Sequence, residues 1–120
     1  MADRVLFIGW GAPVRGREER SIEVFNEAVG LYARMQQEGR LEKFEVVLLT
    51  PSAGLGGFMT LHGSAVQLAA VREDVDFQHN MVAAELVVED LTVVDGYVND
   101  GVAQQMAIYQ DEVHHVAQMA

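Results

Sequence analysis

Cysteine is absent from this sequence. The chain therefore cannot form a disulfide framework, a thiolate nucleophile or a cysteine-ligated zinc site, and its fold must be held together by packing. The start, Met1-Ala2-Asp3-Arg4, also lacks the basic region, apolar stretch and small-residue cleavage site of a secretory signal. We therefore expect a cytoplasmic protein.

Basic residues are scarce and unevenly placed. Eight Lys and Arg stand against eighteen Asp and Glu, which gives a net charge of −10. Residues 1–44 carry seven basic and seven acidic residues, whereas residues 45–120 carry eleven acidic residues and a single basic one, Arg72. Nucleic-acid binding is disfavoured, because phosphate contacts need clustered Lys and Arg. We interpret the acidity as an aid to solubility, with an acidic docking surface as the alternative.

Long hydrophobic runs are missing as well. Apolar residues make up 50% of the chain, but runs such as Val5–Ile8 are far shorter than the roughly 20 residues of a membrane span. We expect a soluble protein without membrane association. A second core would leave each half too small, so residues 1–120 should form one domain, with its core at about 4–98 and a C-terminal extension at about 102–120.

Four short segments rich in β-branched and aromatic residues predict strands, at about 4–10, 44–50, 58–62 and 91–98. We expect the second and third to form a hairpin with a glycine-rich connection. The fourth contains Asp95-Gly96, which suggests a β-bulge.

Helical spacing of apolar residues predicts a long amphipathic helix at about 18–38, ended by Gly39. A broken second helix follows: Ser64 caps a first piece, and Asp74 or Asp76 caps a second piece that extends to Val88. The C-terminal segment forms either a helix or a partly ordered tail, because its apolar residues fall on one helical face: Val102, Met106, Tyr109, Val113 and Val116.

Both faces of the predicted sheet are apolar, because side chains alternate between the faces of a strand. In the first strand the two sets are Val5 and Phe7 against Leu6, Ile8 and Trp10. In the second strand they are Val46 and Leu48 against Val47 and Leu49. Helices can cover one face, so the other needs a partner. A symmetric second copy is the simplest cover, and the C-terminal helix is the competing candidate.

The order strand, helix, strand, strand, helix, strand resembles the dimeric α/β-barrel superfamily, in which two ferredoxin-like subunits press their sheets together. The resemblance covers most of residues 4–98 and is carried by these segments: Val5–Trp10, Glu18–Glu38, Gly57–Gly63 leading into Ser64, and the helix around Phe77. It implies an α+β, ferredoxin-like βαββαβ fold with a four-stranded antiparallel sheet, assembled as a homodimer. The superfamily includes cofactor-free monooxygenases, isomerases and stress-response proteins, so the resemblance implies a fold rather than a reaction.

The loop from Gly9 to Glu19 combines an aromatic ring with two guanidinium groups just before a helix. Trp10, Arg15 and Arg17 are therefore candidate ligand-binding residues, because a helix N-terminus with arginine favours anions. Alternatively the arginines are solvated loop charges and Trp10 is a packing residue. The loop lacks the third glycine of a dinucleotide fingerprint, and the glycine-rich segment 51–57 lacks a Gly-Lys-Ser/Thr ending. We expect no cofactor.

Two histidines are further candidates. His62 shares a strand face with Phe58 and Thr60, where it would line a cavity and act as a catalytic acid or base, or else be a packed residue. His79 is a candidate ligand-binding residue on the second helix, with a solvated position as the alternative. Asp111 and His115 share a helical face, but nothing supplies further ligands, so we expect no metal site.

Serine catalysis has little support, because no Gly-x-Ser-x-Gly elbow surrounds any serine. Asp95 and Tyr97 share a strand face, where we favour an interface role over chemistry. Two hypotheses remain open. The first is a cofactor-independent enzyme or binder of a small metabolite, with a pocket between sheet and helices. The second is a non-catalytic structural or protein-interaction dimer.

Overall fold

The computed structural model describes residues 1–119. These residues form four strands and four helices. In chain order they are β1 (Arg4–Trp10), α1 (Glu18–Gln37), β2 (Lys43–Leu48), β3 (Gly57–Gly63), α2 (Ala65–Glu73), α3 (Val75–Glu85), β4 (Thr92–Tyr97) and α4 (Asp100–Met119).

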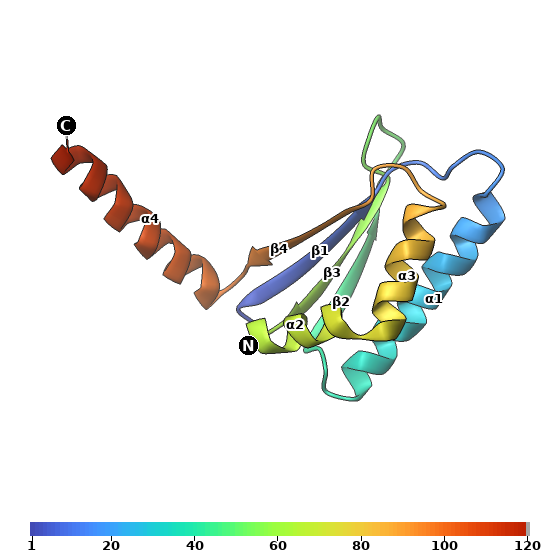
Figure 1. Ribbon diagram of the computed structural model, residues 1–120, viewed down its shortest axis with the longest axis horizontal. Helices are drawn as coiled ribbons and strands as arrows, with labels where there is room; N and C mark the ends of the chain where they lie inside the picture. Colours follow the sequence, from blue (N-terminus) through green and yellow to red (C-terminus); the bar gives the residue numbers. More distant parts are fainter. Residues whose placement is uncertain (120) are drawn as a thin grey trace.

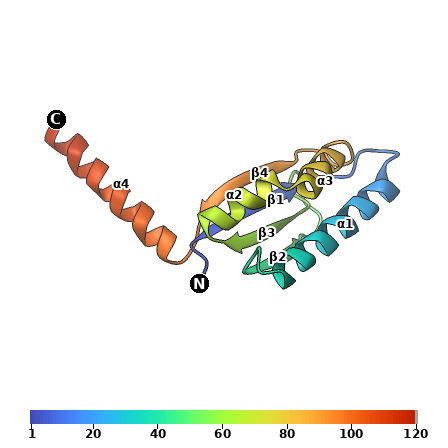
Figure 2. The same ribbon diagram turned by 60° about the horizontal axis from the view of Figure 1, so that its bottom comes forward.

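The strands form one antiparallel sheet in the order β2-β3-β1-β4. β1 lies between β3 and β4, so the first strand in sequence is central and pairs with two later ones. β2 and β3 form the expected hairpin. Helices α1, α2 and α3 lie over one face of this sheet (Figures 1 and 2). The arrangement confirms the α+β, ferredoxin-like fold.

The core lies between the sheet and these three helices. Leu6 and Ile8 of β1 and Leu61 of β3 are buried on the covered face. Across from them, Tyr32 and Met35 of α1 are fully buried. The alternation of β1 therefore runs as the sequence predicts, with Leu6 and Ile8 facing the helices and Val5 and Phe7 facing away.

Local capping explains where the helices start and stop. Ser64 forms a capping box with Gln67: its hydroxyl accepts a bond from the Gln67 amide, and the Gln67 side chain accepts one from the Ser64 amide. The Asp74 carboxylate accepts a bond from the Phe77 amide at 3.0 Å and so caps α3. Gly39 follows α1 with a φ of 75°, which glycine adopts without strain.

Three details differ from the sequence-based expectation. The β1–β4 register runs without interruption through Asp95 and Gly96, so the predicted bulge is absent. β2 ends at Leu48 rather than at residue 50, because its pairing with β3 ends where Leu48 lies opposite Gly57, the first residue of β3. α3 ends at Glu85, and Val88 instead forms an isolated bridge with Pro13 beyond the helix.

Within residues 1–119, no helix covers the second face of the sheet. Its apolar side chains are Val5 and Phe7 from β1, Val47 from β2, Phe58 from β3 and Val94 from β4, and its polar side chains are Lys43, Glu45, Thr60, His62 and Thr92. The rings of Phe7 and Phe58 stack there with their centroids 5.2 Å apart. We call this surface the open face. α4 projects away from the sheet (Figure 1), so it does not provide the cover considered above.

The core predicts a specific loss of stability. Replacing the fully buried Leu61 by Ala should lower the free energy of unfolding by about 2–5 kcal/mol, because the vacated volume is not refilled. Urea denaturation measures the change. The matched control is Val66→Ala on α2, where the side chain is 80% exposed and the change should stay within about 0.5 kcal/mol. Equal losses in the two variants would contradict this description of the core.

Candidate ligand pocket

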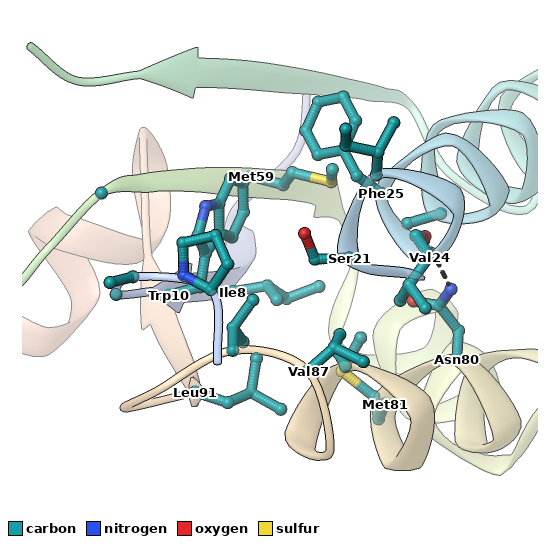
Figure 3. Close-up of a pocket in the computed structure, with 18 of the residues that line it drawn as sticks. Ile8, Trp10, Ser21, Val24, Phe25, Met59, Asn80, Met81, Val87 and Leu91 are labelled. Carbon is teal, nitrogen blue, oxygen red and sulfur yellow. Dashed lines mark hydrogen bonds between the residues drawn. The ribbon is translucent and has the colours of Figure 1, made fainter. Parts of the chain in front are cut away.

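A cavity of about 370 Å³ lies between the sheet and the helices α1 and α3, near the end of β1. β1, α1 and α3 each contribute to its wall, together with the segment that leads from α3 to β4 (Figure 3). The lining side chains are Ile8, Trp10, Ser21, Ile22, Val24, Phe25, Ala28, Tyr32, Leu48, Met59, Asn80, Met81, Ala84, Val87, Val88 and Leu91, with backbone from Gly11, Ala12, Pro13 and Gly56. None of these residues carries a formal charge.

Trp10 is held at the cavity by its neighbours. Its indole meets the ring of Phe25 edge to face, with centroids 6.0 Å apart. On the other side, Gly57 of β3 leaves room for the indole, because a Cβ atom there would lie 2.8 Å from Trp10 Cζ2. Any other residue at position 57 would displace the ring. Figure 3 shows Trp10 and Ile8 projecting from β1 toward Ser21 of α1.

Tyr32 supplies an unusual polar atom. It is fully buried and lines the cavity, and its hydroxyl has no hydrogen-bond partner within the described part of the chain. Burial raises the pKa of the Tyr32 hydroxyl above its ordinary value, because the phenolate would be desolvated. Tyr32 is therefore a neutral, fully buried side chain in the wall of an apolar space.

Two other polar side chains reach the cavity wall and already have backbone partners. Asn80 of α3 is buried and donates to the Val24 carbonyl at 3.2 Å, which ties α3 to α1 (Figure 3). The Ser21 hydroxyl donates to the Glu18 carbonyl at 2.6 Å. Each therefore adds a fixed dipole to the wall. The arrangement suits an uncharged, mainly apolar molecule.

Of the five predicted ligand-binding residues, only Trp10 lines this cavity. Arg15 is exposed in the loop before α1. The Arg17 guanidinium donates to the carbonyl of Leu86, just after α3, so this arginine holds the end of one helix beside the start of another. The structure does not bring the two arginines together with Trp10 around a common ligand space.

The two candidate histidines lie apart from each other. His62 is on the open face, where its Nε2 lies 3.0 Å from the Thr60 hydroxyl. Burial, followed by the positive charge of Lys43, lowers the pKa of His62. His79 is exposed in a surface groove between α1 and α3 that also contains Arg34 and Asp76. Neither imidazole reaches the cavity beside Trp10.

The remaining polar candidates have structural surroundings. Asp95 pairs with Arg72 at 3.3 Å, and the Arg4 guanidinium lies 4.6 Å from the centre of the Tyr97 ring. Asp111 and His115 are exposed on α4. Within residues 1–119, no cluster of three or more His, Asp or Glu side chains is arranged to hold a metal ion. Among the same residues, no helix combines the length and apolar character needed to cross a membrane.

Tyr32, Asn80 and Ser21 are pocket residues that were not among the sequence-based candidates. Tyr32 lies on the buried side of α1, where it packs against Phe44 and Phe77. The available signal was a polar atom at a position predicted to be buried. Asn80 gives the same signal on α3, because a buried amide needs a partner from another element.

Comparison with solved structures supports the fold. A dimeric ferredoxin-like protein of unknown function from Jannaschia sp. CCS1 aligns with a TM-score of 0.62 and 15% identity, covering 79% of this chain and 99% of that one. Another dimeric ferredoxin-like protein of unknown function, from Thermobifida fusca, aligns with a TM-score of 0.60 and 13% identity. The alignment covers 82% of this chain and 93% of that one. SnoaB, a cofactor-independent oxygenase from Streptomyces nogalater, aligns with a TM-score of 0.50 and 16% identity. This alignment also covers 82% of this chain and 93% of the other.

No protein-family model matches the sequence, and no curated protein matches it significantly. At these levels of identity the structural neighbours establish a shared fold. They confirm the resemblance to dimeric ferredoxin-like proteins at the level of architecture and do not identify a subfamily.

The buried hydroxyl of Tyr32 predicts a distinct response to alkali. Because the folded chain holds the neutral phenol, its stability should be full below the ordinary tyrosine pKa of 10.0 and fall as the pH rises above it. Tyr32→Phe should lose stability less steeply in that range. Urea midpoints below and above pH 10 measure the difference. At neutral pH the variant should be at least as stable as the parent, because the removed hydroxyl has no partner.

Proposed function

We propose that this protein binds a small, uncharged and mainly apolar molecule in the cavity between its sheet and the helices α1 and α3. The observation that carries this proposal is the apolar, uncharged wall of a cavity of about 370 Å³, which includes the buried Tyr32 with its unpartnered hydroxyl. A buried hydroxyl without a partner costs about 1–3 kcal/mol. A ligand that bonds to it recovers that cost and fills the apolar space at the same time.

The chemistry of the wall argues against a charged ligand. A carboxylate or phosphate entering the cavity would lose its hydration and find no Lys, Arg or His side chain in the wall. Trp10 and Phe25 instead offer flat apolar surfaces for a ring or a branched chain. Trp10 thus remains in the proposal, whereas Arg15, Arg17, His62 and His79 remain predictions for ligand contact.

Cofactor-independent catalysis is the enzymatic form of the same proposal. It draws support from the fold shared with SnoaB, a cofactor-independent oxygenase. In this form Tyr32 is the only titratable side chain in the wall, and it would act as a neutral hydrogen-bond donor to the substrate. The second candidate function is a non-catalytic interaction dimer, which the dispersal of Arg15, Arg17 and His62 over separate surfaces favours.

Trp10 is the only tryptophan of the chain, so its fluorescence reports directly on the cavity. We expect 1-naphthol to shift or quench this emission and to bind more tightly than naphthalene, which lacks the hydroxyl. In Tyr32→Phe the preference for 1-naphthol should disappear, because a hydrogen bond of this kind contributes about tenfold in affinity. A chain whose Trp10 emission responds to neither probe, nor to a metabolite library, would favour the interaction dimer.

Filling the cavity gives an independent prediction. Ala84 lines the cavity on α3, and Ala84→Phe should place a ring in the space and reduce probe binding at least tenfold. The control is Ala70→Phe on α2, where the residue is exposed and binding should be unchanged. Circular dichroism establishes that both variants are folded. Undiminished binding in Ala84→Phe would place the probe elsewhere on the protein.

We further propose that the protein works as a homodimer whose two open faces pack together. The open face exposes Val94 at 50% and carries the stacked pair Phe7 and Phe58, so a monomer would present apolar rings to water. Solved structures with this fold include proteins described as dimeric, which supports the proposal. In a two-fold dimer each open face would cover the other.

Charge on the open face should prevent this dimer. Val94 lies opposite Phe7 in the β1–β4 register, so Val94→Lys would bury an unpaired ammonium group between the sheets. Sedimentation velocity at micromolar concentration should then show monomers. Val66→Lys, with the same change at an 80% exposed position of α2, should stay dimeric. A wild-type protein that sediments as a monomer would rule out the dimer.

A further inference from the structure

The helix α4 is almost entirely exposed, although one side of it is apolar. Met106 is 48% exposed and Tyr109 and Val116 are each 64% exposed. Together with Val102 and Val113 they are spaced by four, three, four and three residues, which places all five on one side of the helix. We call this set the α4 stripe. The same spacing marks the seam along which helices pack together.

The residues just before α4 are hydrogen-bonded to the residues just before β1. These bonds hold the start of α4 in a defined position. The Val98 amide donates to the Asp3 carbonyl at 3.2 Å, and the Asn99 side chain donates to the Ala2 carbonyl at 2.7 Å. Asn99 itself has a φ of 53°, which turns the chain away from the sheet. Gly101 lies so close to Asp3 that a Cβ atom would be 2.2 Å from the Asp3 carbonyl oxygen.

The dimensions of the subunit show how much surface this arm leaves uncovered. The chain exposes 7789 Å², whereas a compact monomer of 13.2 kDa exposes about 6,400 Å². Its radius of gyration is 17.1 Å, against about 13.6 Å for a compact domain of 120 residues. The excess of roughly 1,400 Å² is of the size that each subunit of an obligate dimer buries.

We propose that α4 is an arm whose stripe packs on a second copy of this chain. The arm leaves the sheet at the end of β4, the strand that carries Val94 of the open face, so it starts at the edge of the dimer surface proposed above. Figure 2 shows the arm extending well beyond the other helices. Its 20 residues span about 30 Å, which is long enough to reach over a subunit of this size.

Charge disfavours the other kinds of partner. The arm contains Asp100, Asp111 and Glu112 and no Lys or Arg. An anionic membrane surface or a nucleic acid would repel it. A second copy meets no such penalty along the stripe, because all five stripe residues are uncharged.

The first test is the dissociation constant of the dimer, measured by sedimentation on full-length variants. Tyr109→Glu, at the centre of the stripe, should raise that constant at least tenfold. Gln104→Glu adds the same charge on the opposite side of α4 and should leave it unchanged. If the two variants dimerise equally well, the arm does not contribute to the dimer.

The second test leaves the stripe intact. The natural chain has no cysteine, so a single introduced cysteine can be labelled with a benzophenone photo-crosslinker at one position. Gln105→Cys, which borders the stripe, should give covalent dimers on illumination, whereas Asp111→Cys, on the far side, should not. Crosslinks only within one chain would overturn the proposal.

This inference rests on the proposed dimer, and the two can fail separately. A dimer that Val94→Lys dissociates, but that gives no crosslink from position 105, retains the open-face interface and rejects the arm. A wild-type chain that sediments as a monomer and gives no covalent dimer rejects both.

Discussion

The central constraint on this structure is that four strands with apolar residues on both faces receive helices on only one face. Leu6 and Ile8 of β1 are buried under the helices α1–α3, whereas Val5 and Phe7, from the same strand, face away from them. Burying each such side chain is worth about 1.5–3 kcal/mol, so the uncovered set is a strong driving force for association. The helical side of the sheet is covered, whereas the apolar side chains of the open face remain uncovered within residues 1–119.

The same helical layer leaves space near the end of β1. α1 and α3 are held together there by the bond from Asn80 to the Val24 carbonyl, while Ala28 and Ala84 are too small to fill the gap between them. Trp10 and Phe25 close one side of the space. A cavity therefore follows from small residues on facing helices, and the buried Tyr32, whose hydroxyl has no hydrogen-bond partner in the described part of the chain, belongs to its wall.

Most of the architecture was predictable because it depends on periodicity and caps. The alternation in β1, the Ser64 cap and the Gly39 terminus are local signals, and each is confirmed. The residues of the cavity were harder to predict from the sequence. The sequence-based candidate Trp10 lines the cavity, but Tyr32 and Asn80 join its wall only through the packing of α1 against α3, which no local spacing encodes. Arg15 is exposed in its loop and does not line this cavity, so its role in ligand contact stays a prediction. The prediction of a β-bulge at Asp95-Gly96 was wrong, because glycine also fits a regular strand.

The cavity and the open face share a strand, which links binding to assembly. Phe7 stacks on Phe58 across the open face, and the next side chain, Ile8, lines the cavity on the other side of the sheet. Phe58 is likewise followed in β3 by Met59, another cavity residue. Because neighbouring residues of a strand are joined rigidly, a shift of β1 or β3 that accommodates a ligand must also move the aromatic pair on the open face. Packing two sheets together therefore restrains the wall of each cavity, and in a dimer both cavities would rest on one central layer.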